Sequence, residues 1–133
     1  MRKVISPRAA ISFLWLSAAS PAEPFVVHPD AHGVQSIDVG LDSYSYTPDH
    51  LVVKAGRPVI VTLRNRAFLV PHNLVLTDPR AGFYLRQEVA AGESARVVFT
   101  PRNLGTFTFY CDKKLLFLPS HREQGMEGKL EVR

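Results

Sequence analysis

The chain has 133 residues, 46% of them hydrophobic, which is enough for one domain with its own core and too few for several. Its formal net charge of +4 is uneven, because residues 23–53 contain five acidic side chains and no Lys or Arg, whereas residues 54–133 contain 13 basic and 7 acidic ones. This pattern can steer a charged partner but does not resemble a nucleic-acid footprint, and a single cysteine, Cys111, excludes an intramolecular disulfide.

Residues 1–22 have the pattern of a secretory signal peptide. A basic start precedes an apolar run over residues 9–19 and then small residues, and we expect cleavage after Ala22. The run is shorter than the roughly 20 residues of a transmembrane helix, so no stable membrane span is expected, although a retained membrane anchor is the alternative. Without this segment the net charge falls to +1. A bacterial periplasmic or secreted location follows from this interpretation.

After a Pro- and His-containing lead-in at residues 23–34, the chain alternates between short β-branched runs and turn residues. No segment keeps a 3.6-residue period. The pattern predicts an all-β fold, an antiparallel sandwich or barrel of about eight strands within one domain over residues 35–133. The expected strands cover residues 35–39, 45–53, 58–63, 73–76, 84–89, 95–99, 106–110 and 129–132.

Cys111 ends one of these strands and is expected to point into the core. Side chains alternate across a strand, so Phe107, Phe109 and Cys111 share one face. An apolar environment disfavours a free thiolate, whereas a bound metal deprotonates the thiol. By the same alternation, His72 shares a face with Leu74. Both side chains therefore point toward an interior in which a metal would stabilise the thiolate.

Two more potential ligands, His121 and Met126, follow Cys111. One thiolate, two imidazoles and one thioether are the ligand set of a type 1 copper site, which transfers single electrons. Zinc is also compatible with part of this set. His28, His32 and His50 are interpreted as solvated surface residues, since His28 and His32 flank a proline and no matching ligand geometry is evident.

The order of several short segments, together with the terminal Cys, His and Met, makes the chain resemble a cupredoxin over about residues 35–133. The segments are Tyr46-Thr47-Pro48, Leu51-Val52-Val53-Lys54-Ala55-Gly56, Val59-Ile60-Val61, Asn65, Pro71-His72-Asn73, Gly105-Thr106-Phe107, Tyr110-Cys111, His121 and Gly125-Met126-Glu127-Gly128.

The resemblance implies a Greek-key β-sandwich or barrel that binds one copper per chain and carries one electron. It implies that His72, Cys111 and His121 are equatorial ligands and that Met126 is the weak axial ligand. It further implies that Asn73 supports the cysteine-bearing loop by hydrogen bonding. Such a protein is an electron carrier or metal-binding protein rather than an enzyme.

The loop between Cys111 and His121 departs from this family. It has nine residues, where two to four are usual in the blue copper proteins that the chain resembles, and it combines Lys113 and Lys114 with an apolar run. Closing a longer loop costs little entropy, so copper binding is still expected. We expect the loop to form a lid or a docking surface. A redox protein partner, either a cytochrome or a copper or haem oxidoreductase, is expected to dock at Lys113, Lys114, Leu116, Phe117 and Arg122.

Two other functions use the same ligands. A periplasmic copper-binding or delivery protein tolerates an open or irregular site, and the long loop favours it. A small red-copper-type enzyme, in which a coordination position is open to substrate, ranks last because the sequence shows no substrate pocket.

Overall fold

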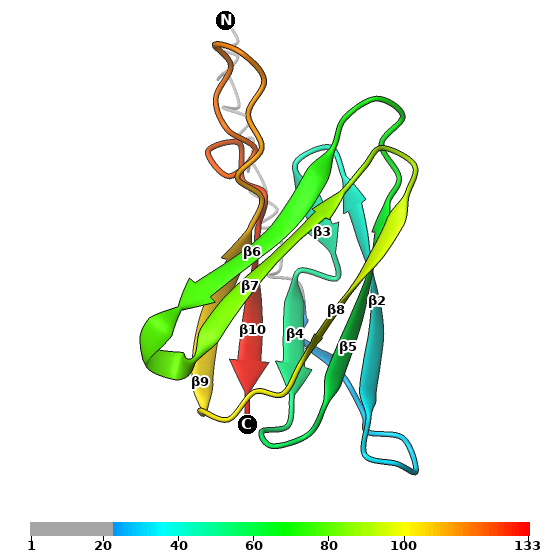
Figure 1. Cartoon of the computed structure of the whole chain (residues 1–133), viewed down its shortest axis with the longest axis vertical. Coiled ribbons are helices and arrows are strands. Elements are labelled where there is room, and N and C mark those ends of the chain that lie inside the picture. The colour runs from blue at the N-terminus through cyan, green and yellow to red at the C-terminus, as the bar shows by residue number, and fades with distance from the viewer. Residues whose placement is uncertain (1–22) are drawn as a thin grey trace, which may run out of the picture.

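The computed structural model describes residues 23–133, which form a sandwich of two β-sheets (Figure 1). The expected signal peptide lies outside the described residues. The all-β prediction is confirmed, with ten strands instead of about eight and one 3-10 turn, η1. The elements are β1 (Phe25–Val26), β2 (Gln35–Asp42), β3 (Ser45–Thr47), β4 (His50–Val53), β5 (Val59–Asn65), β6 (His72–Asp78), η1 (Pro79–Ala81), β7 (Phe83–Val89), β8 (Ser94–Phe99), β9 (Gly105–Tyr110) and β10 (Glu127–Val132).

The larger sheet has the order β1-β4-β10-β9-β6-β7 and the smaller one has the order β3-β2-β5-β8. The expected purely antiparallel pairing is wrong in three places, because β1 with β4, β4 with β10 and β2 with β5 pair in parallel. These pairs join strands that are separated by crossovers between the sheets. Alternation along a strand does not reveal the direction of its neighbour, so the sequence pattern did not separate the two cases.

Two expected segments differ in detail. The expected strand over residues 45–53 is interrupted at Pro48, which has no backbone N–H to donate, and the chain passes there from β3 in the smaller sheet to β4 in the larger one. The lead-in at residues 23–34 is not loose throughout, because β1 pairs with β4 and Val27 lies in the core. Its backbone N–H donates to the carbonyl of Val52.

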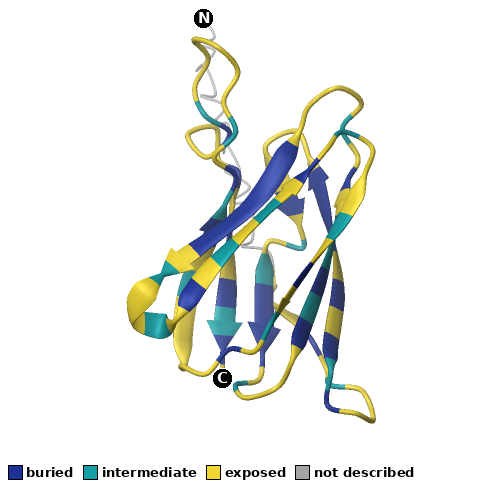
Figure 2. Cartoon of the chain, in the orientation of Figure 1, coloured by how far each residue is buried: buried dark blue, intermediate teal, exposed yellow. Residues whose placement is uncertain are grey.

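The core lies between the two sheets, and burial alternates along several strands (Figure 2). In β5, for example, Val59, Val61 and Leu63 are buried while the residues between them are partly exposed. Phe109 of β9 crosses the core to meet Tyr46 of β3 edge to face, with ring centroids 5.0 Å apart. This packing joins the two sheets close to the residues that follow β9.

Three strand ends meet at one end of the sandwich. β6 begins at His72, β9 ends at Tyr110 and β10 begins at Glu127. Because β9 is antiparallel to both β6 and β10, these three termini share one end of the sheet. His72 and the loop from Cys111 to Met126 are therefore brought together there.

Candidate metal centre

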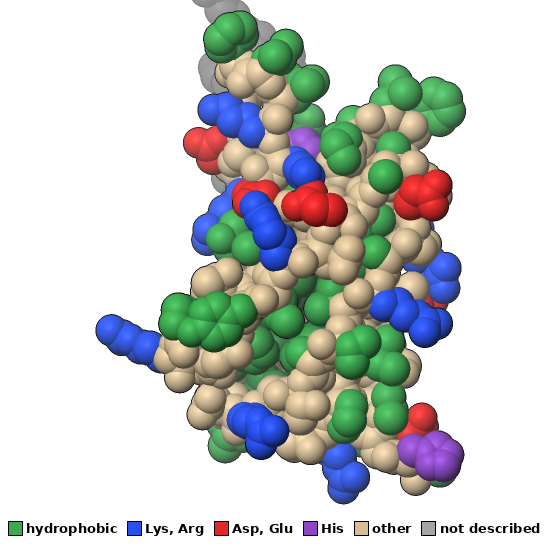
Figure 3. All heavy atoms as spheres, in the orientation of Figure 1, with side chains coloured by type: hydrophobic (Ala, Val, Ile, Leu, Met, Phe, Trp, Pro, Cys, Tyr) green, Lys and Arg blue, Asp and Glu red, His purple; other side chains and the backbone are tan. Residues whose placement is uncertain are grey.

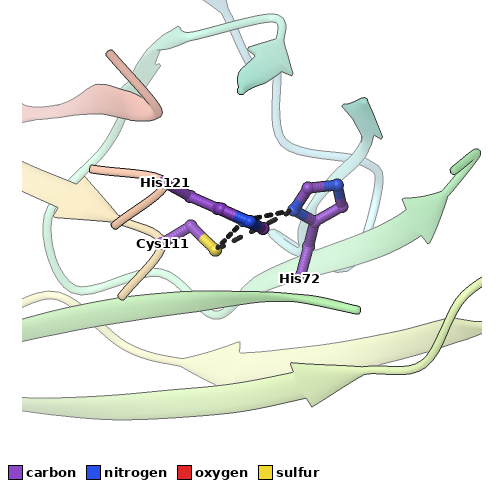
Figure 4. A group of neighbouring side chains, drawn as sticks. All are labelled: His72, Cys111 and His121. Atoms are coloured by element: carbon purple, nitrogen blue, oxygen red, sulfur yellow. Dashed lines mark hydrogen bonds between the residues drawn. The ribbon is translucent and has the colours of Figure 1, made fainter. Parts of the chain in front are cut away.

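Three predicted ligands converge at this end of the sandwich (Figure 4). The Nδ1 atoms of His72 and His121 lie 3.1 Å apart, and the Sγ atom of Cys111 lies 3.9 Å from His72 Nδ1 and 3.5 Å from His121 Nδ1. Among residues 23–133 this is the group of His, Cys, Asp and Glu side chains whose ligand atoms are close enough to hold one ion. All three residues are buried.

The spacing of these atoms fits a transition-metal ion. Typical metal ligand distances are about 2.0 Å to an imidazole nitrogen and about 2.3 Å to a thiolate sulfur. Tetrahedral or trigonal angles then separate the ligand atoms by about 3.3–3.7 Å, close to the three distances found here. One thiolate and two imidazoles also form the donor set that copper electron-transfer sites use. The residues present therefore fit copper in both chemistry and spacing.

Burial sets the protonation of the ligands. Desolvation lowers the pKa of His72 to about 4, with a further decrease from His121 and a partly opposing effect of Asp42. Desolvation also lowers the pKa of His121, and it raises the pKa of the Cys111 thiol. Both imidazoles are thus neutral at neutral pH and ready to bind a metal. The thiol holds its proton until a metal displaces it.

Asn73 connects the strand of His72 to the segment of Cys111. Its Nδ2 donates to Asp112 Oδ1 at 2.7 Å, and its Oδ1 accepts from the Asp112 backbone N–H at 3.1 Å. The Asn73 backbone N–H also lies 3.4 Å from the Cys111 sulfur, where it donates a hydrogen bond. A hydrogen bond of this kind stabilises negative charge on the sulfur. Asn73 therefore has the contacts that the resemblance implied.

A charged cluster continues from this connection to the surface. Both terminal nitrogens of Arg86 donate to Asp112 Oδ2, at 2.8 and 2.6 Å. Glu88 accepts from Asn73 Nδ2 and pairs with Lys113. Asn73 of β6 and two side chains of the adjacent β7 thus hold Asp112 and Lys113, the first two residues after Cys111. This cluster was not expected from the sequence, because its members are far apart in the chain.

Backbone hydrogen bonds link the segments that carry the ligands. The N–H of Cys111 donates to the carbonyl of Met126 at 3.1 Å, and the N–H of Met126 donates to His121 at 2.9 Å. The N–H of His121 in turn donates to the carbonyl of Lys113 at 2.8 Å. Residues 113 and 121 therefore lie next to each other despite the seven residues between them, and the long loop does not separate Cys111 from His121.

Residues 114–120 form a lobe that projects from the sandwich at this closure. The lobe ends in a turn in which Leu118 N–H donates to the Leu115 carbonyl, and Leu116 has a positive φ of 48°. Ser120 and Glu123 exchange two hydrogen bonds at its exit. The expected apolar run is exposed along its length, and Phe117 is 100% exposed. The lobe is a projection and not a plug over the sandwich end.

The His121 ring is recessed, and only 5% of the residue is exposed. Tyr44 meets the ring edge to face, with centroids 5.2 Å apart. A recess of about 120 Å³, whose wall includes Leu69, Val70 and Lys114, ends at His121. Sequence reasoning missed Tyr44, which has a positive φ of 58° in the turn between β2 and β3. Such a φ is uncommon for a large side chain, and no sequence signal predicted it.

Met126 is fully buried beside the other predicted ligands, and its backbone joins Cys111 to His121. Its role as axial ligand stays a prediction. His72 Nε2 is a buried nitrogen without a hydrogen-bond partner in residues 23–133. His28 and His32 are exposed, and His50 pairs with Glu131 at 3.1 Å, so these three histidines lie outside the cluster.

The comparisons with known proteins agree with this geometry. The family model for a cupredoxin-like domain matches residues 8–130. No curated protein sequence shows significant similarity to the chain. The fold is similar to the metal-binding domain of the Cu(I)-exporting P-type ATPase CopA of Streptococcus pneumoniae D39, solved with Cu(I), with a TM-score of 0.65 and 18% identity over 86% of this chain and 99% of that one.

Two blue copper structures are also similar in fold. Reduced auracyanin of Roseiflexus castenholzii gives a TM-score of 0.61 with 22% identity, over 74% of this chain and 96% of that one. Auracyanin A of Chloroflexus aurantiacus gives a TM-score of 0.60 with 22% identity, over 76% of this chain and 100% of that one. Among residues 23–133, none of the helical segments has the length and apolar character needed to cross a membrane.

Proposed function

Because this chain belongs to the cupredoxin-like family and binds one copper ion, we propose that it is an exported one-electron carrier. Copper supplies the one-electron redox chemistry when it is bound. In this proposal His72, Cys111 and His121 are its equatorial ligands, Met126 is the weak axial ligand, and Asn73 orients the cysteine loop.

The observation that carries the proposal is the convergence of two nitrogens and one sulfur within a braced, buried cluster. His72 is fixed by β6, whereas Cys111 and His121 are fixed by the chain of backbone hydrogen bonds through Met126 and Lys113. Ligands that are held from both sides move little when the charge of the site changes. Small movement favours rapid electron transfer, because little of the surroundings must rearrange.

Two routes connect the cluster with the surface. His121 lies at the end of the recess, where an approaching redox centre comes closest to a ligand. Cys111 is preceded in the chain by Tyr110, and the Arg122 guanidinium lies 4.0 Å from the centroid of the Tyr110 ring. We propose that a redox protein docks at Lys113, Lys114, Leu116, Phe117 and Arg122, and the recess that Lys113 and Lys114 line beside His121 supports this.

Export to a periplasmic or extracellular location is part of the proposal and rests on residues 1–22. N-terminal sequencing of the mature protein tests it, and a start at Glu23 is expected.

The direct test is titration of the metal-free protein with Cu(II), followed by optical and EPR spectra and by reduction and reoxidation. We expect an intense visible band that saturates at one equivalent, small copper hyperfine splitting and reversible redox cycling. Pale copper with ordinary hyperfine splitting that does not cycle would contradict the electron-carrier proposal.

The second candidate is a protein for copper binding or delivery. The exposed lobe beside the ligands favours this candidate, because a protein that transfers copper needs a surface near the metal on which the recipient protein can dock. One fold neighbour is a Cu(I)-bound domain of a copper-exporting ATPase, although that likeness concerns the fold alone. Fast transfer of Cu(I) to a chelator without a reversible Cu(II) state would select delivery. A red-copper-type enzyme remains the third candidate.

A further inference from the structure

Two loops project from the metal end of the sandwich, and both have apolar tips (Figure 3). One is the lobe of residues 114–120, and the other is the β5–β6 loop, residues 66–71. Phe68 is 90% exposed and Leu69 78%, while Leu116 is 79% exposed. In Figure 3 hydrophobic side chains cover the ends of the two projections, and the surface is hollowed between them. Clusters of exposed apolar residues of this size indicate an interaction surface.

The charges around the tips favour an anionic surface. Neither residues 66–71 nor residues 113–119 contain an acidic side chain. Arg66 begins the first loop, where its guanidinium lies beside Gly40 of β2, and Lys114 stands at the base of the second loop. Neither forms an ion pair with another residue in 23–133. Apolar residues that project beyond unpaired cations match the layering of a bilayer interface, where phosphates lie outside the acyl chains.

The shape also distinguishes a lipid surface from a rigid protein. A flat protein face meets two separate tips and leaves the hollow between them empty, whereas a deformable lipid surface accommodates both tips. Within residues 115–118 the Leu118 N–H donates to the Leu115 carbonyl, and the other backbone groups have no backbone partner among residues 23–133. The tip therefore inserts only to the hydrated interface, where water and headgroups satisfy these groups, and not into the acyl core.

The direction of the chain is consistent with this orientation. β10 begins next to Met126 and runs away from the metal end, and β1 and β4 are parallel to it. Residues 23 and 24 therefore lead into β1 from the side of the metal end.

We propose that the tips of residues 67–70 and 115–118 insert into an anionic lipid surface, with Arg66 and Lys114 at the level of the phosphates. The metal end then faces the membrane. Lipid covers Lys114, Leu116 and Phe117 in this state, so this contact and the docking of a redox protein at the same residues exclude each other. The lipid contact itself does not depend on electron transfer. It requires only the exposed tips and their flanking cations.

The test places a tryptophan at the tip of the lobe in the copper-loaded full chain. Trp15 is the only tryptophan in the sequence, so Phe117→Trp is made together with Trp15→Phe. The matched control, Tyr84→Trp with Trp15→Phe, carries the probe at an exposed position at the opposite end of the sandwich. Both are mixed with vesicles of phosphatidylcholine and phosphatidylglycerol that contain brominated acyl chains.

We expect a blue shift for the probe at position 117 and quenching about threefold or more stronger than for the probe at position 84. Arg66→Gln with Lys114→Gln should weaken binding to these vesicles by about 25-fold, at about fivefold for each cation. An unshifted emission at position 117 would overturn the proposal, even if the protein sediments with vesicles through another segment. A shift caused by protein concentration without lipid would overturn it in favour of self-association.

The readouts separate this inference from the proposed function. The visible copper band of each variant reports the metal site, whereas quenching reports the tip. Loss of lipid contact with an intact band overturns only the lipid proposal. Failure to form the band with normal quenching overturns only the electron-carrier proposal.

Discussion

The backbone N–H of His121 donates to the carbonyl of Lys113 at 2.8 Å, and this bond closes the lobe at its base. As a result, the path from Cys111 to His121 is short in space although nine residues separate them in sequence. The extra residues lie outside the path between the ligands. Loop length and ligand geometry are therefore independent in this protein.

The first prediction concerns removal of the lobe. Replacing residues 114–120 by Asn-Gly leaves Lys113 and His121 at the ends of a four-residue β-turn, in which the same hydrogen bond forms. We expect one equivalent of copper to bind with an unchanged visible band, measured by optical titration. In the control, Asn-Gly replaces residues 112–118 instead, which removes Asp112 and its hydrogen bonds to Asn73. Loss of copper binding in the first variant would show that the lobe itself shapes the site.

The second prediction concerns the sulfur ligand. Cys111→Ser removes the thiolate, so the intense visible absorption should disappear. Copper affinity should fall by more than about 100-fold. This exceeds the roughly 10–100-fold loss that is typical when a residue that hydrogen-bonds to a metal ligand is replaced. His28→Gln, at an exposed position, is the control and should change neither. An unchanged spectrum in Cys111→Ser would remove the cysteine from the site.

The third prediction separates axial ligation from packing at Met126. Met126→Leu keeps an apolar side chain of similar volume in a fully buried position, so the fold should persist. If the thioether is the axial ligand, copper remains bound and its reduction potential rises, because the axial ligand tunes it. Voltammetry measures this directly. A potential equal to that of the parent protein would mean that Met126 only packs.

The fourth prediction concerns Asn73. Asn73→Ala removes two part-buried hydrogen bonds with Asp112, one to its backbone N–H and one to its carboxylate, at about 0.5–1.5 kcal/mol each and so about 1–3 kcal/mol together. We expect the free energy of unfolding of the metal-free protein to fall by this amount in urea titrations. Asn103→Ala, which removes one exposed hydrogen bond to Ala81, should change it by less than about 0.5 kcal/mol. Equal losses in the two variants would contradict a special role for Asn73.

The fifth prediction is a pH dependence of the metal-free fold. The pKa of His72 falls from an ordinary value near 6.5 to about 4 in the folded state, so the unfolded chain binds protons more readily. The stabilisation that depends on neutral His72 is complete above pH 6.5 and decreases as the pH falls toward 4. The pKa of His121 is lowered in the same direction.

Urea titrations between pH 6.5 and 5 isolate this effect. Carboxyl groups such as Glu88, whose pKa is lowered by its hydrogen bond with Lys113 among other contacts, keep their charge in this range. We expect the free energy of unfolding to decrease across it, and His72→Gln to flatten the slope. A slope unaffected by His72→Gln would show that the buried histidine is not the group responsible.

The sequence predicted those features that depend on local pattern. Alternation along β9 and the residue after it placed Phe109 and Cys111 in the core, as observed, and His72 is also buried as expected, although residues 72–76 of β6 are all buried and do not alternate. The features that it missed depend on contacts between distant residues. The edge contact of Tyr44 with His121 and the pairing of Arg86 with Asp112 have no signature in either segment alone.

The sequence showed that the loop between Cys111 and His121 is longer than in related proteins, but it did not predict the hydrogen bond that closes the base of the lobe. A hydrogen bond from residue 121 to residue 113 depends on where β9 and β10 fix the two ends of this segment, and no turn motif of the loop specifies it. Likewise, the break at Pro48 became visible only once β3 and β4 were assigned to different sheets. Tertiary packing decided both features.

The closed base of the lobe makes it a natural insertion point. A foreign peptide placed between Lys113 and His121 would begin and end at two atoms 2.8 Å apart, so it would not stretch the fold. The grafted segment would also stand beside a coloured centre whose spectrum responds to its surroundings. If a ligand bound to the grafted peptide and disturbed this hydrogen bond, the visible absorption of the proposed copper site would change. The protein could therefore serve as a scaffold for optical sensors.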